Sequence, residues 1–202
     1  MIRRGILVLL LMLPGCADDL LGPSGPAPKL YTLVAPQAAA SPGPTVTWQL
    51  LVDAPSATLA LDSSRIAIAP APNRIDYYAD VAWADRAPAM LQEAILESFD
   101  RSGRIPAVQR QAGGLRADYV LALDLQNFEV DAAQASPAAH LRFTAKLVRM
   151  RDRSIVASHG FEADAPIRGA GFDAVTEAFE QGLGEVLPEL VSWTLAEGDR
   201  GR

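Results

Sequence analysis

Two stretches in the second half of the chain alternate apolar and polar residues, and this pattern restricts the fold more than any other feature. Every second position from Leu121 to Leu125 is leucine, and residues 140–147 alternate in the same way. Successive side chains of a strand point to opposite faces, so both stretches predict strands with one buried and one solvated face, as in antiparallel sheets. A polar turn at residues 151–154 leads into a third strand over 155–163, which predicts a hairpin.

Two other stretches have the three-to-four-residue spacing of amphipathic helices. Over residues 87–102 the apolar positions fall on one stripe, Pro88 suits the first turn, and Gly103 provides the C-terminal stop. Residues 171–195 predict a longer helix with a kink at Pro188. Strands that precede and follow the first helix indicate a mixed sheet with helices packed on it, in the α/β or α+β class.

Shorter strand-like runs precede the first helix and place the start of the folded domain near residue 47. They cover residues 48–52, 65–69, 74–78 and 81–84. We therefore assign residues 47–196 to one domain and residues 197–202 to a polar, frayed tail. Residues 16–46 are rich in Pro, Ala, Gly and Ser, which is typical of an extended tether. Within this tether the apolar run at 30–34 predicts a short strand that docks onto the domain.

The N-terminus has the anatomy of a removable secretory signal peptide. Arg3 and Arg4 precede an apolar run at 6–13, and the small residue Gly15 precedes Cys16. The run is too short to span a bilayer core of roughly 30 Å, which takes about 20 residues of helix. We predict a signal peptide over residues 1–15. Cys16 is the single cysteine, so the exported domain contains no disulfide.

Residues that carry catalysis or bind metals are scarce in this chain. The two histidines, His140 and His159, lie on strands of the predicted hairpin, where they could approach each other. Without an acidic or cysteine partner at ligand spacing they indicate surface histidines rather than a metal pair. Lys and Arg total 18 against 24 Asp and Glu, with no basic patch for nucleic acid. We predict no catalytic residue, no cofactor, no metal site and no nucleic-acid partner.

Residues Leu13-Pro14-Gly15-Cys16 resemble the lipobox of bacterial lipoproteins. In such proteins the thiol receives a diacylglyceryl group, the signal is cut before the cysteine, and the new N-terminus is acylated, for which we expect palmitate. Pro14 is an unusual occupant of its position in the motif. The resemblance implies lipid attachment at Cys16, and two or more acyl chains anchor stably at ~0.8 kcal/mol per buried CH₂.

Most of the remaining chain resembles the ABC-type transport auxiliary lipoproteins. The resemblance rests first on residues 61–67 and 75–85, where Tyr77, Tyr78 and Trp83-Ala84 form a tyrosine and Trp-Ala element just before the first predicted helix. Further matching residues are Tyr31-Thr32-Leu33, Ala117-Asp118-Tyr119-Val120-Leu121, Phe128, Phe161, Ala163, Pro166 and Trp193. These positions are structural in character and identify no active site.

The resemblance implies both a fold and a role. The fold is an α/β three-layer sandwich, and the role is non-enzymatic: a partner of an ABC permease, an ATPase and an MCE-domain protein that together move lipids between the inner and outer membranes. The PqiC-like branch implies an outer-membrane lipoprotein that faces the periplasm and docks onto an MCE tunnel as a homo-oligomeric ring. Ala17, in place of a retention-favouring Asp, favours the outer membrane over the alternative, the periplasmic face of the inner membrane.

Three aromatic residues are candidates for the partner interface, namely Tyr77, Tyr78 and Trp83, because aromatic side chains are enriched in interface cores. Their alternative role is core packing beside the first helix, which we favour for Trp83. A different function is also open: a periplasmic lipoprotein that itself binds a lipid or other small apolar ligand. That function predicts a cavity of several hundred Å³ with an apolar lining.

Overall fold

Strand β7 (Tyr119–Asp131) is the centre of the sheet in the computed structural model, which describes residues 27–34, 43–110, 117–133 and 136–201. Along one edge β7 pairs antiparallel with β8 (Ala138–Arg149) over its whole length. β8 in turn pairs antiparallel with β9 (Ser154–Pro166). The hairpin expected from the polar turn is therefore confirmed, and its strands extend a few residues beyond the alternating core at each end.

The other edge of β7 is lined by short parallel strands that follow one another along its length. These are β2 (Leu50–Val52), β3 (Ser56–Ala57) and β4 (Arg65–Ala71). β2 continues the sheet to β6 (Val108–Arg110), and β4 continues it to β5 (Arg74–Trp83) and then to β1 (Lys29–Tyr31). Strands β1 and β6 thus end the sheet on this side of the molecule.

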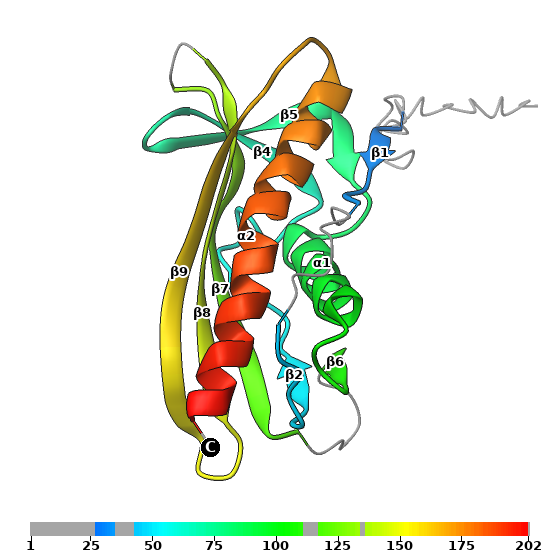
Figure 1. Cartoon of the computed structure of the whole chain (residues 1–202). Helices are drawn as coiled ribbons and strands as arrows, with labels where there is room; N and C mark the ends of the chain where they lie inside the picture. Colours follow the sequence, from blue (N-terminus) through cyan, green and yellow to red (C-terminus); the bar gives the residue numbers. More distant parts are fainter. Residues whose placement is uncertain (1–26, 35–42, 111–116, 134–135, 202) are drawn as a thin grey trace, which may run out of the picture.

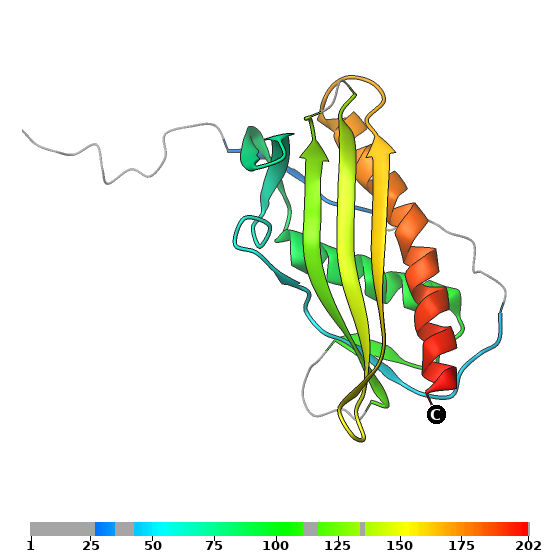
Figure 2. The same cartoon turned by 90° about the vertical axis from the view of Figure 1, so that its left-hand side faces the viewer.

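Two helices pack against this mixed sheet, α1 (Ala87–Ser102) and α2 (Phe172–Arg200). In Figure 1 α2 runs along β7–β9, and α1 lies beside α2 on the side of β1, β2 and β6. Figure 2 shows β7–β9 from the left-hand side of Figure 1, with α1 behind them and α2 behind and beside β9. The outward face of these three strands carries exposed polar side chains such as Arg142, Lys146 and Glu162. The predicted α/β sandwich, a mixed sheet packed by two main helices, is confirmed.

Helix α1 begins and ends where the sequence predicts. Its apolar stripe is buried, with Leu91, Ile95 and Phe99 each at most 1% exposed. Gly103 ends it with a φ of 62°, a left-handed conformation that glycine adopts without steric penalty. The local sequence alone determines this element, because stripe, first-turn proline and terminal glycine all indicate the same boundaries.

Helix α2 runs to Arg200, five residues beyond the predicted end, so most of the predicted frayed tail is helical. Tertiary contacts hold this last turn. The Tyr119 hydroxyl donates to the carbonyl of Gly198 at 2.8 Å, and the Trp48 indole N–H donates to Asp199 at 3.1 Å. Both partners lie more than 75 residues away in the chain, so local sequence patterns cannot reveal them. The helix also continues through Pro188 as one element.

The short strands differ most from the predictions. The two runs at 74–78 and 81–84 form the single strand β5, and the register shifts in its pairing with β4 account for the broken pattern. β3 and β6 were not predicted, because they contain two and three residues and exist only through pairing with β7 and β2. The expected strand at 30–34 is present at residues 29–31.

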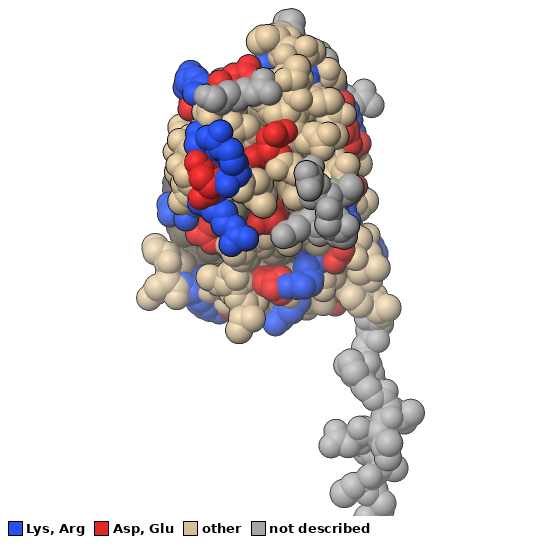
Figure 3. Space-filling model, turned by 90° about the horizontal axis from the view of Figure 1, so that it is seen from below, with Lys and Arg blue, Asp and Glu red and all other residues tan. Residues whose placement is uncertain are grey.

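The turn between β8 and β9 lies at the lower end of the molecule in Figure 1, close to the end of α2. Asp152 accepts hydrogen bonds from the amide and hydroxyl of Ser154 and from Arg149. Arg149 also donates to the carbonyl of Gly201 at 2.6 Å, which ties the turn to α2. Figure 3 views the molecule from this end and shows basic and acidic side chains interspersed rather than gathered by sign.

These hydrogen bonds make stability at this turn dependent on pH. The Ser154 donors, followed by Arg149, lower the pKa of Asp152 from 3.8 to about 2. A lowered folded-state pKa contributes stability above the unfolded value, and this contribution is lost as pH falls from about 4 to 2. We expect a small effect, because the carboxylate is exposed. Thermal unfolding midpoints of wild type should fall more steeply over this range than those of Asp152→Asn, and parallel curves would contradict the assignment.

Candidate functional site

The segment that leads from the N-terminus to the domain is fastened to the sheet beside a cluster of aromatic rings. β1 pairs in parallel with the end of β5, with Tyr31 opposite Trp83. Phe172, the first residue of α2, lies at the centre of the cluster. Its ring centroid is 4.6 Å from that of Tyr31, 5.2 Å from that of Tyr78 and 6.3 Å from that of Trp83. The rings meet tilted or edge-on, the arrangement aromatic pairs favour.

Polar contacts fasten the same segment. The amide of Ala84 donates to the carbonyl of Tyr31 at 2.7 Å, and the amide of Val34 donates to the carboxylate of Glu180 on α2 at 3.0 Å. Burial first, and then the nearby Asp173 carboxylate, raise the pKa of the Tyr31 hydroxyl above its usual 10.0. Residues 29–34 are therefore joined to both β5 and α2, while Leu30 and Val34 stay 67% and 60% exposed.

The structure separates the three aromatic residues predicted to form an interface. Trp83 is 1% exposed and packs edge-on against Phe179 and Phe128, with centroids 5.2 and 5.9 Å away, so it belongs to the core. Tyr78 is half-buried against Phe172, and burial raises the pKa of its hydroxyl. Only Tyr77 and Tyr78 therefore retain surface that a partner could contact.

Tyr77 lies next to Tyr78 on β5 but faces different neighbours. Its hydroxyl donates to the carbonyl of Ala60 at 3.2 Å. The guanidinium carbon of Arg65 lies 3.7 Å from the centre of its ring, within the range of a cation–π contact. The side chains of the two tyrosines thus lie on opposite faces of β5 and do not form one patch. Sequence analysis missed Phe172, whose only signal was its place on the apolar stripe of α2.

A groove of about 230 Å³ lies between the segment after β1 and helix α1. Thr32 and Leu33 form one side. The other lining residues are Ala84, Asp85, Ala89, Met90, Gln92, Glu93, Ala94, Glu97 and Arg110. Arg110 pairs with Glu93 across it. A groove with charged groups in its lining differs from the apolar cavity that a lipid carrier predicts.

The remaining predicted residues have simple placements. Cys16 lies outside the described residues. His140 lies on the outward face of β8 between acidic residues of β9, whereas His159 lies on the helix side of β9, where its ring meets Trp193 at 6.0 Å. The two histidines therefore face opposite sides of the sheet, and the idea that they could approach each other is wrong. Within the part of the chain that the structure describes, no helix combines the length and apolar composition needed to cross a bilayer.

Proteins of known structure and sequence share this fold. Protein XCC0632 from Xanthomonas campestris is 39% identical, with a TM-score of 0.75 over 85% of this chain and 98% of its own. An uncharacterized protein of known structure shares the fold at 12% identity, with a TM-score of 0.65 over 83% of this chain and 98% of its own. Uncharacterized protein bll6063 from Bradyrhizobium diazoefficiens is 26% identical over 88% of this chain, which spans about half (48%) of that protein's length.

Comparison with family sequence patterns then shows the family to which the chain belongs. The sequence pattern of the ABC-type transport auxiliary lipoprotein component family matches residues 31–191. That class consists of lipoproteins that assist ATP-binding-cassette transport systems. This chain belongs to the ABC-type transport auxiliary lipoprotein component family, as its sequence resemblance predicted. The match begins at Tyr31, the last residue of β1, so residues 31–34 of the docked segment lie within the family domain.

Proposed function

We propose that the chain is a non-enzymatic docking component of an ABC/MCE-type system that moves lipids between the inner and outer membranes. Lipid on Cys16 holds it at the outer membrane, facing the periplasm, and the folded domain binds the MCE-domain protein. Family membership supports the transport role. The observation that carries the docking role is the fastening of residues 29–34 to β5 and α2, because it couples the position of the anchor to that of the domain.

The docked segment also limits how far the domain can lie from the membrane. Only residues 17–28 separate Cys16 from β1. At most ~3.3–3.6 Å per residue, these twelve residues reach about 40 Å. A tether free up to residue 46 would reach about 100 Å, so docking of β1 shortens it by more than half. A short tether suits a protein that works close to one membrane.

The surface that we assign to the partner is the β1–β5 edge, defined by Leu30, Val34 and Tyr78, whereas Tyr77 faces Ala60 and Arg65 instead. Leu30 and Val34 are the exposed apolar residues of the docked segment. β1 ends the sheet order on this side, and an edge strand offers backbone groups and alternate side chains to an incoming chain. We further propose that several copies of this chain form a ring on an MCE tunnel, as the resemblance to PqiC-like proteins implies.

The anchor is tested by fatty-acid labelling in a strain that lacks the chromosomal gene and expresses the full chain. Wild type should incorporate an alkyne-bearing fatty acid and fractionate with the outer membrane. Cys16→Ala should incorporate none and should fail to restore the function of the transport system. Labelling of both proteins, or of neither, would contradict lipidation at Cys16.

The docking surface is tested in the same strain by photo-crosslinking, which separates it from the anchor. A benzophenone amino acid that replaces Leu30 or Val34 should crosslink to the MCE-domain protein. The same amino acid in place of Arg142, on the outward face of β8, serves as the matched control and should not crosslink. Crosslinks from position 142 alone would reject the β1–β5 edge while leaving the anchor intact.

A further inference from the structure

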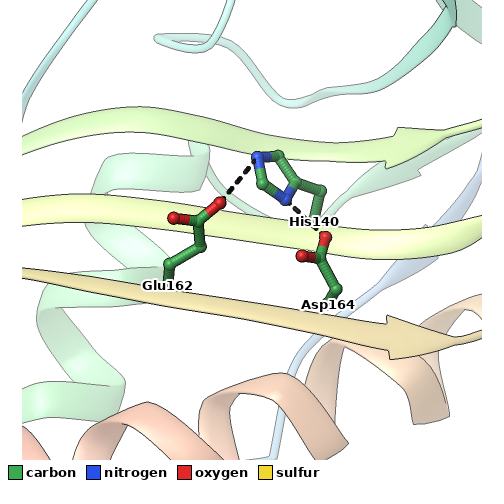
Figure 4. Close-up of side chains that lie close together, drawn as sticks. All are labelled: His140, Glu162 and Asp164. Atoms are coloured by element: carbon green, nitrogen blue, oxygen red, sulfur yellow. Dashed lines mark hydrogen bonds and ion pairs between the residues drawn. The ribbon is translucent and has the colours of Figure 1, made fainter.

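The outward face of β8 and β9 brings a histidine between two carboxylates. His140 on β8 lies opposite Asp164 on β9, and the neighbouring rung pairs Arg142 with Glu162. Nδ1 of His140 lies 2.6 Å from a carboxylate oxygen of Asp164, and Nε2 lies 3.9 Å from a carboxylate oxygen of Glu162 (Figure 4). One ligand atom from each of the three residues can be chosen so that all lie within 4.8 Å of one another.

The imidazole is held in place while the carboxylates keep access to solvent. The side chain of His140 is 18% exposed, whereas those of Glu162 and Asp164 are 53% and 61% exposed. On the other side of His140, Glu129 of β7 occupies the same rung and is 7% exposed. The histidine therefore lies in a row of acidic groups that would attract a cation.

The nearby Arg142 does not pair with the carboxylate of Glu162, which a cation would need. Arg142 is the direct cross-strand neighbour of Glu162. Its Nε donates instead to the side-chain oxygen of Gln126 on β7, at 3.1 Å. The guanidinium is thus turned toward β7, away from β9, and Glu162 stays directed at Nε2 of His140 in Figure 4.

The two contacts of the imidazole define different roles for the two carboxylates. A proton on Nδ1 donated to Asp164 leaves the lone pair of Nε2 facing Glu162. Metal-binding histidines commonly donate their second ring N–H to a carboxylate in this way, which orients the ring and raises its basicity. Asp164 therefore corresponds to the orienting group, and Nε2 of His140 and the carboxylate of Glu162 correspond to ligands.

The geometry points to a divalent transition-metal site that bridges β8 and β9, with His140 and Glu162 as ligands and Asp164 as the positioning residue. Metal–ligand bonds of about 2.0–2.2 Å at a tetrahedral angle separate two ligand atoms by about 3.4 Å. The observed 3.9 Å requires Glu162, whose side chain is half exposed, to move by about half an ångström. An imidazole with a carboxylate suits Zn²⁺ or Ni²⁺, and water completes the coordination.

Sequence analysis predicted no metal site, because no acidic residue lies at ligand spacing from either histidine. Glu162 and Asp164 follow His140 by more than 20 residues and reach it only through the register of the hairpin. This inference is independent of the proposed docking role, since the site lies on the outward face of β8 and β9 and the β1–β5 edge lies elsewhere on the sheet.

Zinc titration of the full chain, purified in detergent without an affinity tag, tests the site. We expect wild type to bind one Zn²⁺ saturably in calorimetry and to unfold at a higher temperature with Zn²⁺ than with EDTA. His140→Asn should abolish both effects. Asp164→Asn should weaken binding by about 10-fold or more, as loss of an orienting group does, and Glu162→Gln should weaken it further.

The second histidine provides the matched control. His159 lies 3.6 Å from Glu189, but among the described residues no third His, Cys, Asp or Glu side chain joins this pair in a cluster. His159→Asn should therefore bind Zn²⁺ like wild type. Each variant should unfold at the wild-type temperature in EDTA, which separates loss of the site from loss of the fold. Equal zinc binding by wild type and His140→Asn, or loss of binding in His159→Asn alone, would overturn the assignment.

Discussion

Replacement of Trp83 by alanine should lower the free energy of unfolding by about 3–5 kcal/mol, the usual cost of removing a large buried aromatic side chain. Trp83 is 1% exposed, and Phe128, Phe172 and Phe179 surround its ring. The cavity left behind lies where β5 and α2 meet β7, so neighbouring side chains cannot collapse into it without moving these elements. Chemical denaturation monitored by circular dichroism measures the change.

Trp83→Phe is the matched control for this prediction. The indole N–H of Trp83 has no hydrogen-bond partner among the residues that the structure describes. Phenylalanine keeps an aromatic ring and removes this unpaired donor, so part of the packing loss is offset. We expect its effect to be about half that of alanine or less. Equal effects of the two substitutions would show that the indole makes a contact that the ring packing does not explain.

Gly198 should tolerate no larger side chain, and Gly198→Val should destabilise the protein by about 3 kcal/mol. A Cβ atom at this position would lie 2.8 Å from Cε2 of Trp48 and closer still to Cζ2. Trp48 is fully buried and cannot move aside, because its indole donates to Asp199 and its ring packs edge-on against Tyr119. The last turn of α2 should therefore detach from the sheet.

Gly160→Val on β9 is the control for Gly198→Val, since a Cβ at position 160 would meet nothing within 4 Å. This variant should unfold within about 0.5 kcal/mol of wild type, as surface substitutions usually do. Thermal unfolding and hydrogen exchange of residues 195–200 measure both variants. Wild-type protection of these amides in Gly198→Val would contradict the proposed packing against Trp48.

Elements whose sequence pattern and environment agree were predictable here. Helix α1 carries its own boundary signals, and the alternating leucines of β7 are buried on one face of the strand. The lipoprotein family was also predictable, since its characteristic residues in β5 and β7 are local in sequence. In each case neighbouring residues contain enough information to determine the outcome.

The features that were missed depend on partners distant in the chain. The end of α2 is set by Trp48 and Tyr119, and β3 and β6 exist only through their pairing with longer strands. Trp83 and Tyr78 share a short stretch of sequence, but only Trp83 is fully buried, because Phe128 of β7 and Phe179 of α2 pack against its ring. The acidic neighbours of His140 likewise come from a separate strand, and only the register of the hairpin brings them together.

The parallel pairing of β1 with β5 has a mechanical consequence for an anchored protein. Tension between the membrane and the domain acts first on three paired residues, Lys29–Tyr31. If they separate, the next attachment is the hydrogen bond from the amide of Val34 to the carboxylate of Glu180. The five residues 29–33 are then released, which adds up to about 18 Å to the tether. With the proposed lipid on Cys16, the tether would therefore have a shorter length while β1 is paired with β5 and a longer length after β1 separates.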